Sequence, residues 1–271
     1  MTDSFAWVPD GVDVTKPDAS RVYDYALGGV HNFAVDRAFW DQTAKMMPEA
    51  AALARANRAF LGRAVRELVG AGTTQFLDIG SGIPTLGNVH EAAQDVDPHA
   101  RVMYVDRDPI AVRQSRALLS GNPLAEAIEA DLRDPDAILY HRQVLELLDF
   151  SRPVAVLLVA VLHFIPDGDR PAAIISRIAD ALVSGSYLVI SHAVPASTEK
   201  GRAAQEAVRK LYERTATPGI IRDRAEVAAL IDDRFDLVEP GLVAPTDWRL
   251  EPDEADDPPQ QAALVAVARK R

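Results

Sequence analysis

The amino-acid sequence predicts an α/β protein built on a mostly parallel sheet with helices on both of its faces. Between residues 75 and 190, short apolar runs alternate with helical patterns, and this alternation is typical of parallel strands joined by right-handed crossovers. The run at residues 154–159 is almost wholly aliphatic, as expected of a parallel strand that is buried on both faces. Two final runs, 235–238 and 263–267, follow one another with no helix between them. We therefore expect them to close the sheet as an antiparallel pair.

The residues before this alternation predict an arm followed by helices. Residues 1–20 hold prolines and a glycine among polar side chains, which indicates irregular structure. Residues 20–37 have a helical pattern that Gly28-Gly29 interrupts. Residues 50–69 form a firmer helix, because apolar side chains recur there at three- and four-residue spacing and glycines follow.

The strands and their connecting helices follow in chain order. The predicted strands are residues 75–79, 101–105, 126–130, 154–159, 187–190, 235–238 and 263–267. The predicted helices are residues 86–95, 109–120, 171–182, 199–214 and 223–231. We divide the chain into an N-terminal arm with a helical segment, residues 1–72, and an α/β domain, residues 73–271.

Composition and charge restrict the class of protein further. The 271 residues carry 40 acidic and 29 basic side chains, a formal net charge of −11, which disfavours nucleic acid or an anionic membrane as a partner. The absence of cysteine excludes disulfides, thiolate metal ligands and cysteine nucleophiles. The longest apolar run, residues 154–162, is too short to span a bilayer, and the first residues do not resemble a signal peptide. We expect a cytoplasmic protein.

The residues most indicative of function lie where the first predicted strand passes into the next helix, in Leu77-Asp78-Ile79-Gly80-Ser81-Gly82-Ile83-Pro84-Thr85. In open parallel sheets, ligands bind at the carboxyl ends of the strands, and glycines there let the main chain approach a ligand closely. A dinucleotide site would prefer a third glycine where this chain has Thr85. The carboxylate of Asp78 suits a ligand with an ammonium and a sulfonium better than a pyrophosphate. The alternative is a purely structural turn.

Two further acids follow the next two strands. Asp106 ends the second strand, 24 residues after Gly82, where a carboxylate can accept hydrogen bonds from both hydroxyls of a ribose. Asp131 follows the third strand, where it can accept from the exocyclic amine of an adenine. Either acid alone could be a helix or turn cap, as we expect for Asp108 before Pro109. Together with the glycine loop they predict a nucleoside site.

These motifs resemble a bacterial family of S-adenosylmethionine-dependent methyltransferases whose substrates are mostly unassigned. The matching stretches, which extend over nearly the whole chain, are residues 20–37, 77–85, 87–91, 102–109, 129–132 and 217–219. The resemblance implies a Rossmann-like class I methyltransferase fold, with a seven-stranded sheet whose last strand is antiparallel. It implies cofactor contacts at Asp78, Gly80, Gly82, Asp106, Asp131 and Leu132, and we include the adjacent Ser81 and Arg107.

The N-terminal segment is interpreted as a lid over the cofactor. It mixes aromatic and polar side chains around a flexible glycine pair that could act as a hinge. We include in the predicted cofactor site its residues Tyr23, Gly28, Gly29, Asn32 and Phe33. Arg21 is predicted to pair with the cofactor carboxylate. The alternative is an accessory helix that packs on the sheet.

Three histidines are candidates for a catalytic base. His163 follows the buried fourth strand and is expected to face the reaction centre, whereas His31 and His192 are better explained as structural. A pKa near 6.5 suits histidine for proton removal from an acceptor, although His163 is explained equally well by a structural role. Methyl transfer from a sulfonium mainly requires donor and acceptor to be held in line. A base is therefore not required, and no metal site is evident.

The favoured function is transfer of a methyl group from S-adenosylmethionine to an unidentified acceptor, with S-adenosylhomocysteine as the product. The acidic charge balance favours a small molecule as that acceptor. A second hypothesis is a protein that binds the cofactor without turnover, as a sensor would. A third is an NAD(P)-binding oxidoreductase, which the missing third glycine disfavours. The missing cysteine excludes covalent methylation of cytosine carbon, and no Asn-Pro-Pro-Tyr or Asp-Pro-Pro-Tyr follows the fourth strand.

Overall fold

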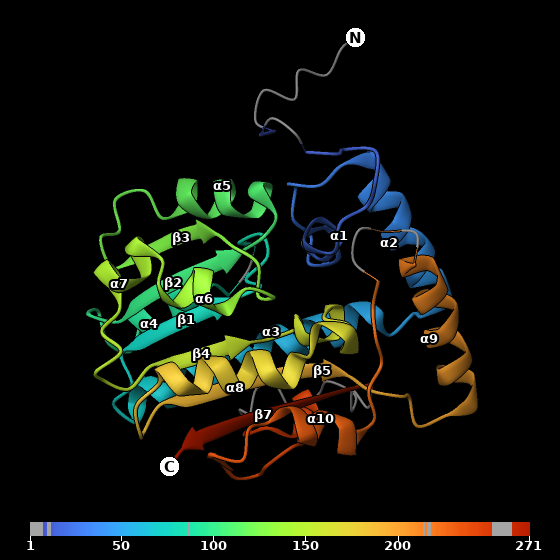
Figure 1. The fold of residues 1–271 in the computed structure, drawn as a ribbon. Coiled ribbons are helices and arrows are strands. Elements are labelled where there is room, and N and C mark those ends of the chain that lie inside the picture. Colours follow the sequence, from blue (N-terminus) through green and yellow to red (C-terminus); the bar gives the residue numbers. More distant parts are fainter. Residues whose placement is uncertain (1–7, 10–11, 86, 214, 216–217, 251–261) are drawn as a thin grey trace.

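The computed structural model describes residues 8–9, 12–85, 87–213, 215, 218–250 and 262–271. These residues form a seven-stranded sheet whose order is β3-β2-β1-β4-β5-β7-β6, shown in Figure 1. The strands are β1 Gln75–Ile79, β2 Arg101–Asp106, β3 Ala125–Glu129, β4 Ala155–Leu158, β5 Tyr187–Ala193, β6 Phe235–Leu237 and β7 Ala263–Lys270. The predicted fold class is confirmed.

The strand order reverses between β1 and β4. From β1 the chain adds β2 and β3 on one side, and it then returns to add β4 and β5 on the other, with all these neighbours parallel. The last strand, β7, is antiparallel to both β5 and β6, which confirms the predicted closing pair. A ligand crevice is expected outside the carboxyl ends of β1 and β4, because the connecting helices leave those two strands in opposite directions.

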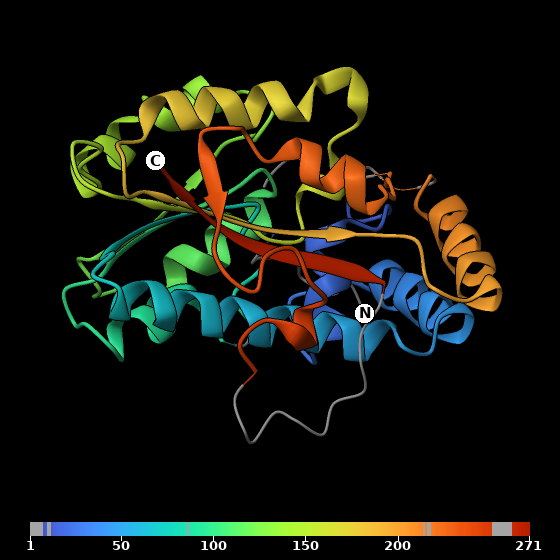
Figure 2. The same ribbon diagram turned by 90° about the horizontal axis from the view of Figure 1, so that it is seen from below.

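Helices cover both faces of the sheet (Figures 1 and 2). They are α1 Ala19–Ala26, α2 Ala34–Met46, α3 Ala50–Gly70, α4 Val89–Gln94, α5 Pro109–Leu118, α6 Pro135–Leu139, α7 Arg142–Leu147, α8 Pro171–Ala181, α9 Glu199–Tyr212 and α10 Arg224–Leu230. Buried side chains of α3, α4 and α5 share one apolar cluster with the sheet, and those of α6, α7, α8 and α10 share another on the opposite face. No helix in the described ranges is long and apolar enough to cross a membrane.

The third helix belongs to the core although it precedes the sheet in sequence. Phe60, Leu61 and Leu68 of α3 are buried in the same cluster as Phe76 of β1. The indole of Trp248, which is fully buried, packs edge-on against Phe60 with ring centres 5.4 Å apart. The long connection after β6 therefore folds back on α3. Part of the acid-rich connection at 240–259 lies outside the described residues.

Three helices, namely α6, α7 and most of α2, were not predicted from the sequence. Residues 20–37 contain α1 and the beginning of α2, and α2 continues to Met46. Helices α6 and α7 lie between β3 and β4 and are only five and six residues long. Segments this short complete fewer than two helical turns. Their apolar spacing is therefore too brief to show a period in sequence, and local caps and packing decide them.

Candidate functional site

A cavity of about 330 Å³ opens at the carboxyl ends of the central strands. Its walls come from the ends of β1, β2 and β3, from the chain after β4, and from α1, α2, α3 and α9. Nine predicted site residues line it: Tyr23, Gly80, Ser81, Gly82, Asp106, Arg107, Asp131, Leu132 and His163. The strand ends and the helices beside them thus bring together residues up to 140 positions apart (Tyr23 to His163) at the topological switch point.

The backbone conformation of the glycine loop after β1 favours glycine over other residues. Gly80 and Gly82 have φ angles of +74° and +67°, a region that glycine adopts without strain. A Cβ atom at Gly80 would lie 2.4 Å from Cγ2 of Val161. At Gly82 a Cβ would meet nothing within 4 Å. Gly80 is therefore required for packing against the chain after β4, whereas Gly82 leaves open space beside the cavity.

Asp106 connects the end of β2 with the glycine loop. Its carboxylate accepts hydrogen bonds from the backbone N–H groups of Gly82 and Asp108, both at 2.8 Å. Burial raises the pKa of Asp106 to about 6, although the two backbone hydrogen bonds favour the charged form. Two donors leave acceptor capacity on the carboxylate. As predicted, Asp108 is the N-cap of α5, accepting from Ile110 N at 2.9 Å.

Asp78 is a buried carboxylate whose oxygens have no hydrogen-bond partner among the described residues. Its side chain does not line the cavity. Burial raises the pKa of Asp78 to about 7, and the nearby charge of Asp106 raises it further while Arg58 opposes the shift. Buried charged groups normally have partners. An unbonded carboxylate directly before the glycine loop is therefore costly for stability and suits a cationic ligand.

Asp131 and Leu132 form the part of the cavity wall that follows β3. The Asp131 carboxylate accepts from Nε of Arg133, at 3.0 Å to one oxygen and 3.1 Å to the other. This pairing holds the pKa of Asp131 below its usual range. The carboxylate is thus ionised and partly exposed to the cavity, where it can accept a further hydrogen bond.

Arg21 is engaged within the protein and does not line the cavity. It is buried, lies 3.1 Å from Asp36 and 3.5 Å from Asp108, and donates to the carbonyl of Lys16 at 2.7 Å. These contacts join α1 to α2 and to the start of α5. The guanidinium that we expected to pair with the cofactor carboxylate is therefore surrounded by two carboxylates of the chain itself.

Four other predicted residues of the N-terminal segment also lie outside the cavity wall: Gly28, Gly29, Asn32 and Phe33. The Asn32 amide donates to the Asp24 carboxylate and to the carbonyl of Gly29, both at 2.9 Å. Phe33 packs with Ile83 of the glycine loop and with Ile110. These residues support the wall from behind, and only Tyr23 of the segment's predicted contacts faces the cavity.

Asp24 is a residue that the sequence reasoning missed. Its buried carboxylate accepts from the Thr85 hydroxyl at 2.6 Å and from the His31 backbone N–H at 2.9 Å. A Cβ at Gly29 would lie 2.0 Å from the same carboxylate. Asp24 therefore ties α1 and the turn after it to the glycine loop. The signal in the sequence was only an acid between two tyrosines. Opening of this segment as a lid stays a prediction.

His163 is held in an environment that keeps it neutral. Burial, with the nearby charge of Arg222, lowers the pKa of His163 to about 3. Its Nδ1 is buried and makes no hydrogen bond within the described part of the chain. The ring lies 4.3 Å from that of Phe164, centre to centre. Because a base with so low a pKa holds a proton poorly near neutral pH, His163 suits contact with a substrate better than proton removal.

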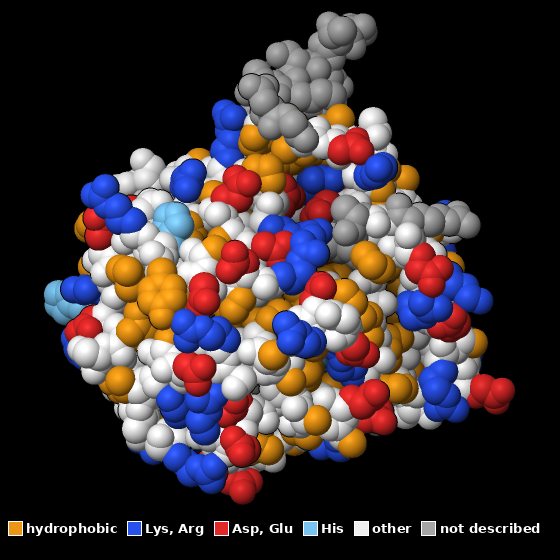
Figure 3. All heavy atoms as spheres, in the orientation of Figure 1, with side chains coloured by type: hydrophobic (Ala, Val, Ile, Leu, Met, Phe, Trp, Pro, Cys, Tyr) orange, Lys and Arg blue, Asp and Glu red, His pale blue; other side chains and the backbone are white. Residues whose placement is uncertain are grey.

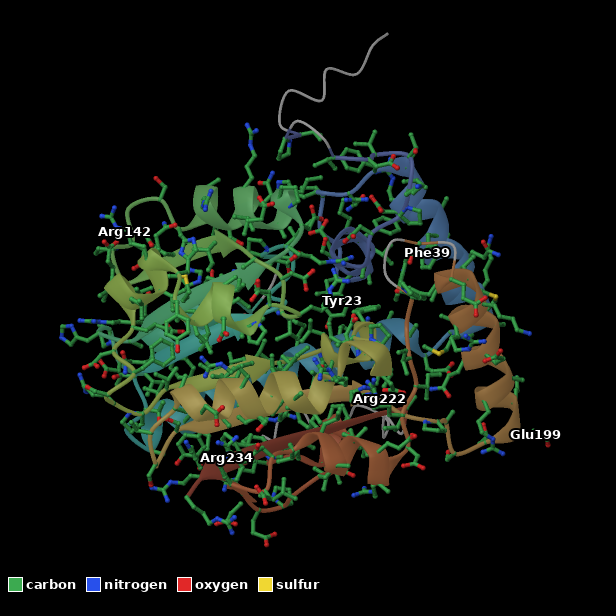
Figure 4. The ribbon with its side chains drawn as sticks, in the orientation of Figure 1. Tyr23, Phe39, Arg142, Glu199, Arg222 and Arg234 are labelled. Carbon is green, nitrogen blue, oxygen red and sulfur yellow. The ribbon has the colours of Figure 1, made fainter. Side chains whose placement is uncertain are left out.

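His192 and Arg222 are buried next to His163 and are hydrogen-bonded to each other. The sequence did not predict this contact. Arg222 donates to Nε2 of His192 at 2.8 Å, so Nε2 is the acceptor and Nδ1 carries the proton given to the Ala193 carbonyl. Burial lowers the pKa of His192 to about 4. Arg222 also donates to the carbonyls of Leu162 and Ile165 and to Asp167. These bonds fix the chain that carries His163, and Arg222 is labelled in Figure 4.

The protein has a parallel sheet closed by an antiparallel last strand. A glycine loop and strand-end acids surround its cavity at the switch point. These features define the Rossmann-like methyltransferase class. The comparisons with known proteins agree. The sequence matches the family model described as S-adenosyl methyltransferase over residues 5–271. The chain belongs to this family and is an S-adenosylmethionine-dependent methyltransferase.

Solved structures support the same assignment. A DUF574 family protein from Streptomyces avermitilis is 37% identical, with a TM-score of 0.89 over 96% of this chain and 99% of that one. A candidate methyltransferase from Thermobifida fusca is 40% identical, with a TM-score of 0.88 over 98% and 99% of the two chains. Mitomycin 7-O-methyltransferase, at 20% identity and a TM-score of 0.50 over 93% of this chain and 68% of that one, shares the fold. Among curated proteins, no significant match was found.

Proposed function

We propose that the cavity binds S-adenosylmethionine against the glycine loop and transfers its methyl group to a small-molecule acceptor. The observation that carries this proposal is that the glycine loop after β1 and the strand-end acids Asp106 and Asp131 line one cavity at the switch point of the sheet. Behind the loop, the buried carboxylate of Asp78 favours a ligand that brings a positive charge, such as an ammonium group, in addition to the charge of Arg58. Asp106 and Asp131 have free acceptor positions for the ribose hydroxyls and the adenine amine. The residues present therefore fit this cofactor.

Bound S-adenosylmethionine would supply an electrophilic methyl group on a positively charged sulfur. The protein's own part is to hold the two reactants in line and to exclude water. Gly80 and Gly82 let the main chain approach the cofactor, and Asp106 fixes the loop by accepting from Gly82 N. His163 contributes a neutral surface, since the pKa of about 3 makes it a poor base.

The acceptor is proposed to be small because neither charge nor surface favours a polyanion. The net charge is −11, and basic and acidic side chains are interspersed on the face shown in Figure 3. A binding protein without turnover would keep the same cofactor contacts. Calorimetry with S-adenosylhomocysteine tests the cofactor site, and a screen for transfer of a radiolabelled methyl group tests turnover. Binding without transfer to any extract or library compound would favour the sensor.

Cofactor affinity is predicted to fall in acid. The ionised carboxylates are the binding forms, and burial raises the pKa of Asp106 to about 6 and that of Asp78 to about 7. Affinity should be constant above pH 8 and fall about tenfold per pH unit for each carboxyl that is protonated in the free protein. Calorimetry in two buffers of different ionisation enthalpy should detect proton release near pH 6. A flat profile from pH 5 to pH 8 would contradict the proposed contacts.

Replacing Asp78 by asparagine is predicted to separate stability from binding. The pKa of Asp78 is about 7 when folded against 3.8 for the unconstrained group, so the folded chain holds an extra proton between these values. Stability of the free protein therefore falls as pH rises from 4 to 7. Asp78→Asn should raise the free energy of unfolding at pH 8 by up to about 4 kcal/mol, and should weaken cofactor binding. Urea denaturation at pH 8 and pH 4 measures the gain, which should vanish at the lower pH.

A further inference from the structure

The cavity extends beyond the proposed cofactor contacts into a part walled by aromatic and aliphatic side chains. We call this part the aromatic compartment and define it by six of its residues: Tyr23, Trp40, Met47, Leu53, Phe164 and Tyr212. They come from α1, α2, α3, α9 and the short turn of 3-10 helix Leu162–Phe164, η1. Helices α2 and α9 stand at the end of the molecule away from β2 and β3 (Figures 1 and 2). The compartment thus lies on the side of the cavity that faces away from β2 and β3 (Figure 1).

Two aromatic rings of this compartment, Phe164 and Tyr212, contact each other and neighbouring rings. The ring of Tyr212 lies 6.0 Å from that of Phe164 and 4.7 Å, edge to face, from that of Phe39. Phe164 in turn lies against the imidazole of His163. Figure 4 labels Phe39 of α2, which lies beside α9, and Tyr23 of α1. A ring that enters the compartment could make offset or edge-to-face contacts of the same kind with Phe164 and Tyr212, both of which line the cavity.

Charged and amide groups near the compartment already have partners within the protein. Arg209 donates to Glu206 and Glu213, each at 2.7 Å. The Gln205 amide accepts from Ala196 N at 2.7 Å and donates to the Val194 carbonyl at 2.8 Å. A charged acceptor would lose water here without gaining a new counter-charge from these groups, which is costly. The compartment therefore selects against an anion, and the carboxylate of Asp18, which lines the same cavity and acts on Tyr212, disfavours an anion further.

One polar group remains available to orient a ligand. The hydroxyl of Tyr212 makes no hydrogen bond to any described residue, and Tyr212 is one of the residues that line the cavity. Burial raises its pKa well above the usual value, so it is a neutral donor and acceptor. Ligand pockets typically combine apolar walls with a few such polar groups that fix orientation.

We propose that the aromatic compartment binds the methyl acceptor and that this acceptor is a neutral, planar aromatic compound bearing a hydroxyl or amine. This inference rests on the proposed function. The acceptor's lone pair forms the new bond to the methyl carbon, and the carbon–sulfur bond breaks with its electron pair left on sulfur. The proton of the acceptor passes to water. The ring packs beside Trp40, Phe164 and Tyr212, and a polar substituent bonds to the Tyr212 hydroxyl.

Binding of three matched probes to the protein saturated with S-adenosylhomocysteine tests the proposal. The probes are 2-naphthol, its carboxylate analogue 6-hydroxy-2-naphthoate, and decahydro-2-naphthol, which has similar size without aromatic rings. Ligand-observed NMR should show 2-naphthol binding at least tenfold more tightly than either analogue. Equal binding, or preference for the carboxylate, would overturn the proposal. Failure of S-adenosylhomocysteine itself to bind in calorimetry would instead overturn the proposed function.

Substitutions in the aromatic compartment test whether 2-naphthol binds there. Trp40→Ala and Phe164→Leu should each weaken 2-naphthol binding at least fivefold while leaving the Kd of S-adenosylhomocysteine unchanged. Tyr212→Phe keeps the ring and should cause a smaller loss. Tyr140→Ala is the matched control, because Tyr140 is an exposed aromatic residue at the end of α6 and does not line the cavity. Unchanged 2-naphthol binding in folded Trp40→Ala and Phe164→Leu proteins would show that the ring binds elsewhere.

Discussion

Asp106→Ala is expected to weaken binding of S-adenosylhomocysteine at least about a hundredfold. The substitution removes a carboxylate that is placed to accept from both ribose hydroxyls, and each charge-assisted hydrogen bond contributes about 1.5 kcal/mol or more. It also removes the acceptor of Gly82 N, at 2.8 Å, so the glycine loop loses a contact with β2. Calorimetry at pH 8, where the carboxyl is ionised, measures the loss.

Two comparisons make the Asp106 result specific. Asp97→Ala removes an acid on the surface, whose carboxylate accepts only from the backbone of His99 in the described structure, and it should leave the Kd unchanged. Asp106→Asn keeps an oxygen for Gly82 N but has no charge, so it should bind weakly and release fewer protons near pH 6, where only Asp78 remains to lose one. A folded Asp106→Ala protein with less than a threefold change in Kd would remove this residue from the site.

Gly80→Val is expected to abolish measurable cofactor binding. The backbone at Gly80 has a φ of +74°, and a Cβ there would lie 2.4 Å from Cγ2 and 2.6 Å from Cβ of Val161. Left-handed backbone at a β-branched residue costs about 1–3 kcal/mol, and the overlap must in addition displace the loop or the chain after β4. Both segments line the cavity. Calorimetry with S-adenosylhomocysteine should therefore show more than a hundredfold loss, and urea denaturation a lower stability.

The chain offers a control for backbone strain alone. Gly121 has a φ of +91° in the turn before β3, and a Cβ there would meet nothing within 4 Å. Gly121→Val should destabilise the protein without altering the cofactor Kd. Conversely, the double substitution Gly80→Ala with Val161→Gly removes both overlapping atoms of Val161 but keeps the strain at residue 80, so it should recover part of the binding. Normal binding by Gly80→Val would show that the loop does not hold the cofactor.

The strands of the sheet could be predicted from the sequence because most of them are short, aliphatic and separated by helices. The predicted third strand, residues 126–130, is β3 Ala125–Glu129 in the structure, a shift of one residue. The segments that escaped prediction are α6, α7 and most of α2. Their positions depend on what they pack against, such as the contact of α2 with α9, rather than on a strong local period.

The cofactor half of the candidate site was predictable for a similar reason. Strand ends in a parallel sheet meet at one edge, so acids and glycines at those ends converge whatever the details of packing. Asp106, Asp131 and the glycine loop do line one cavity. The partners of Arg21, by contrast, come from α2 and the start of α5. A buried arginine could serve a ligand or a structural ion pair, and only its neighbours in space distinguish the two.

By itself, the sequence determined the class of the protein, because the hydrophobic period, the glycines and the strand-end acids are local features. In a parallel sheet the strand ends lie at one edge, so these local features come together as a site. Tertiary structure alone decided which polar groups remain available. It engages Arg21 with two carboxylates, keeps His163 neutral beside Arg222, and leaves Asp78 and the Tyr212 hydroxyl without partners among the described residues. The physical reason is that a side chain's charge and hydrogen-bonding capacity depend on neighbours that are distant in sequence and on exclusion of water.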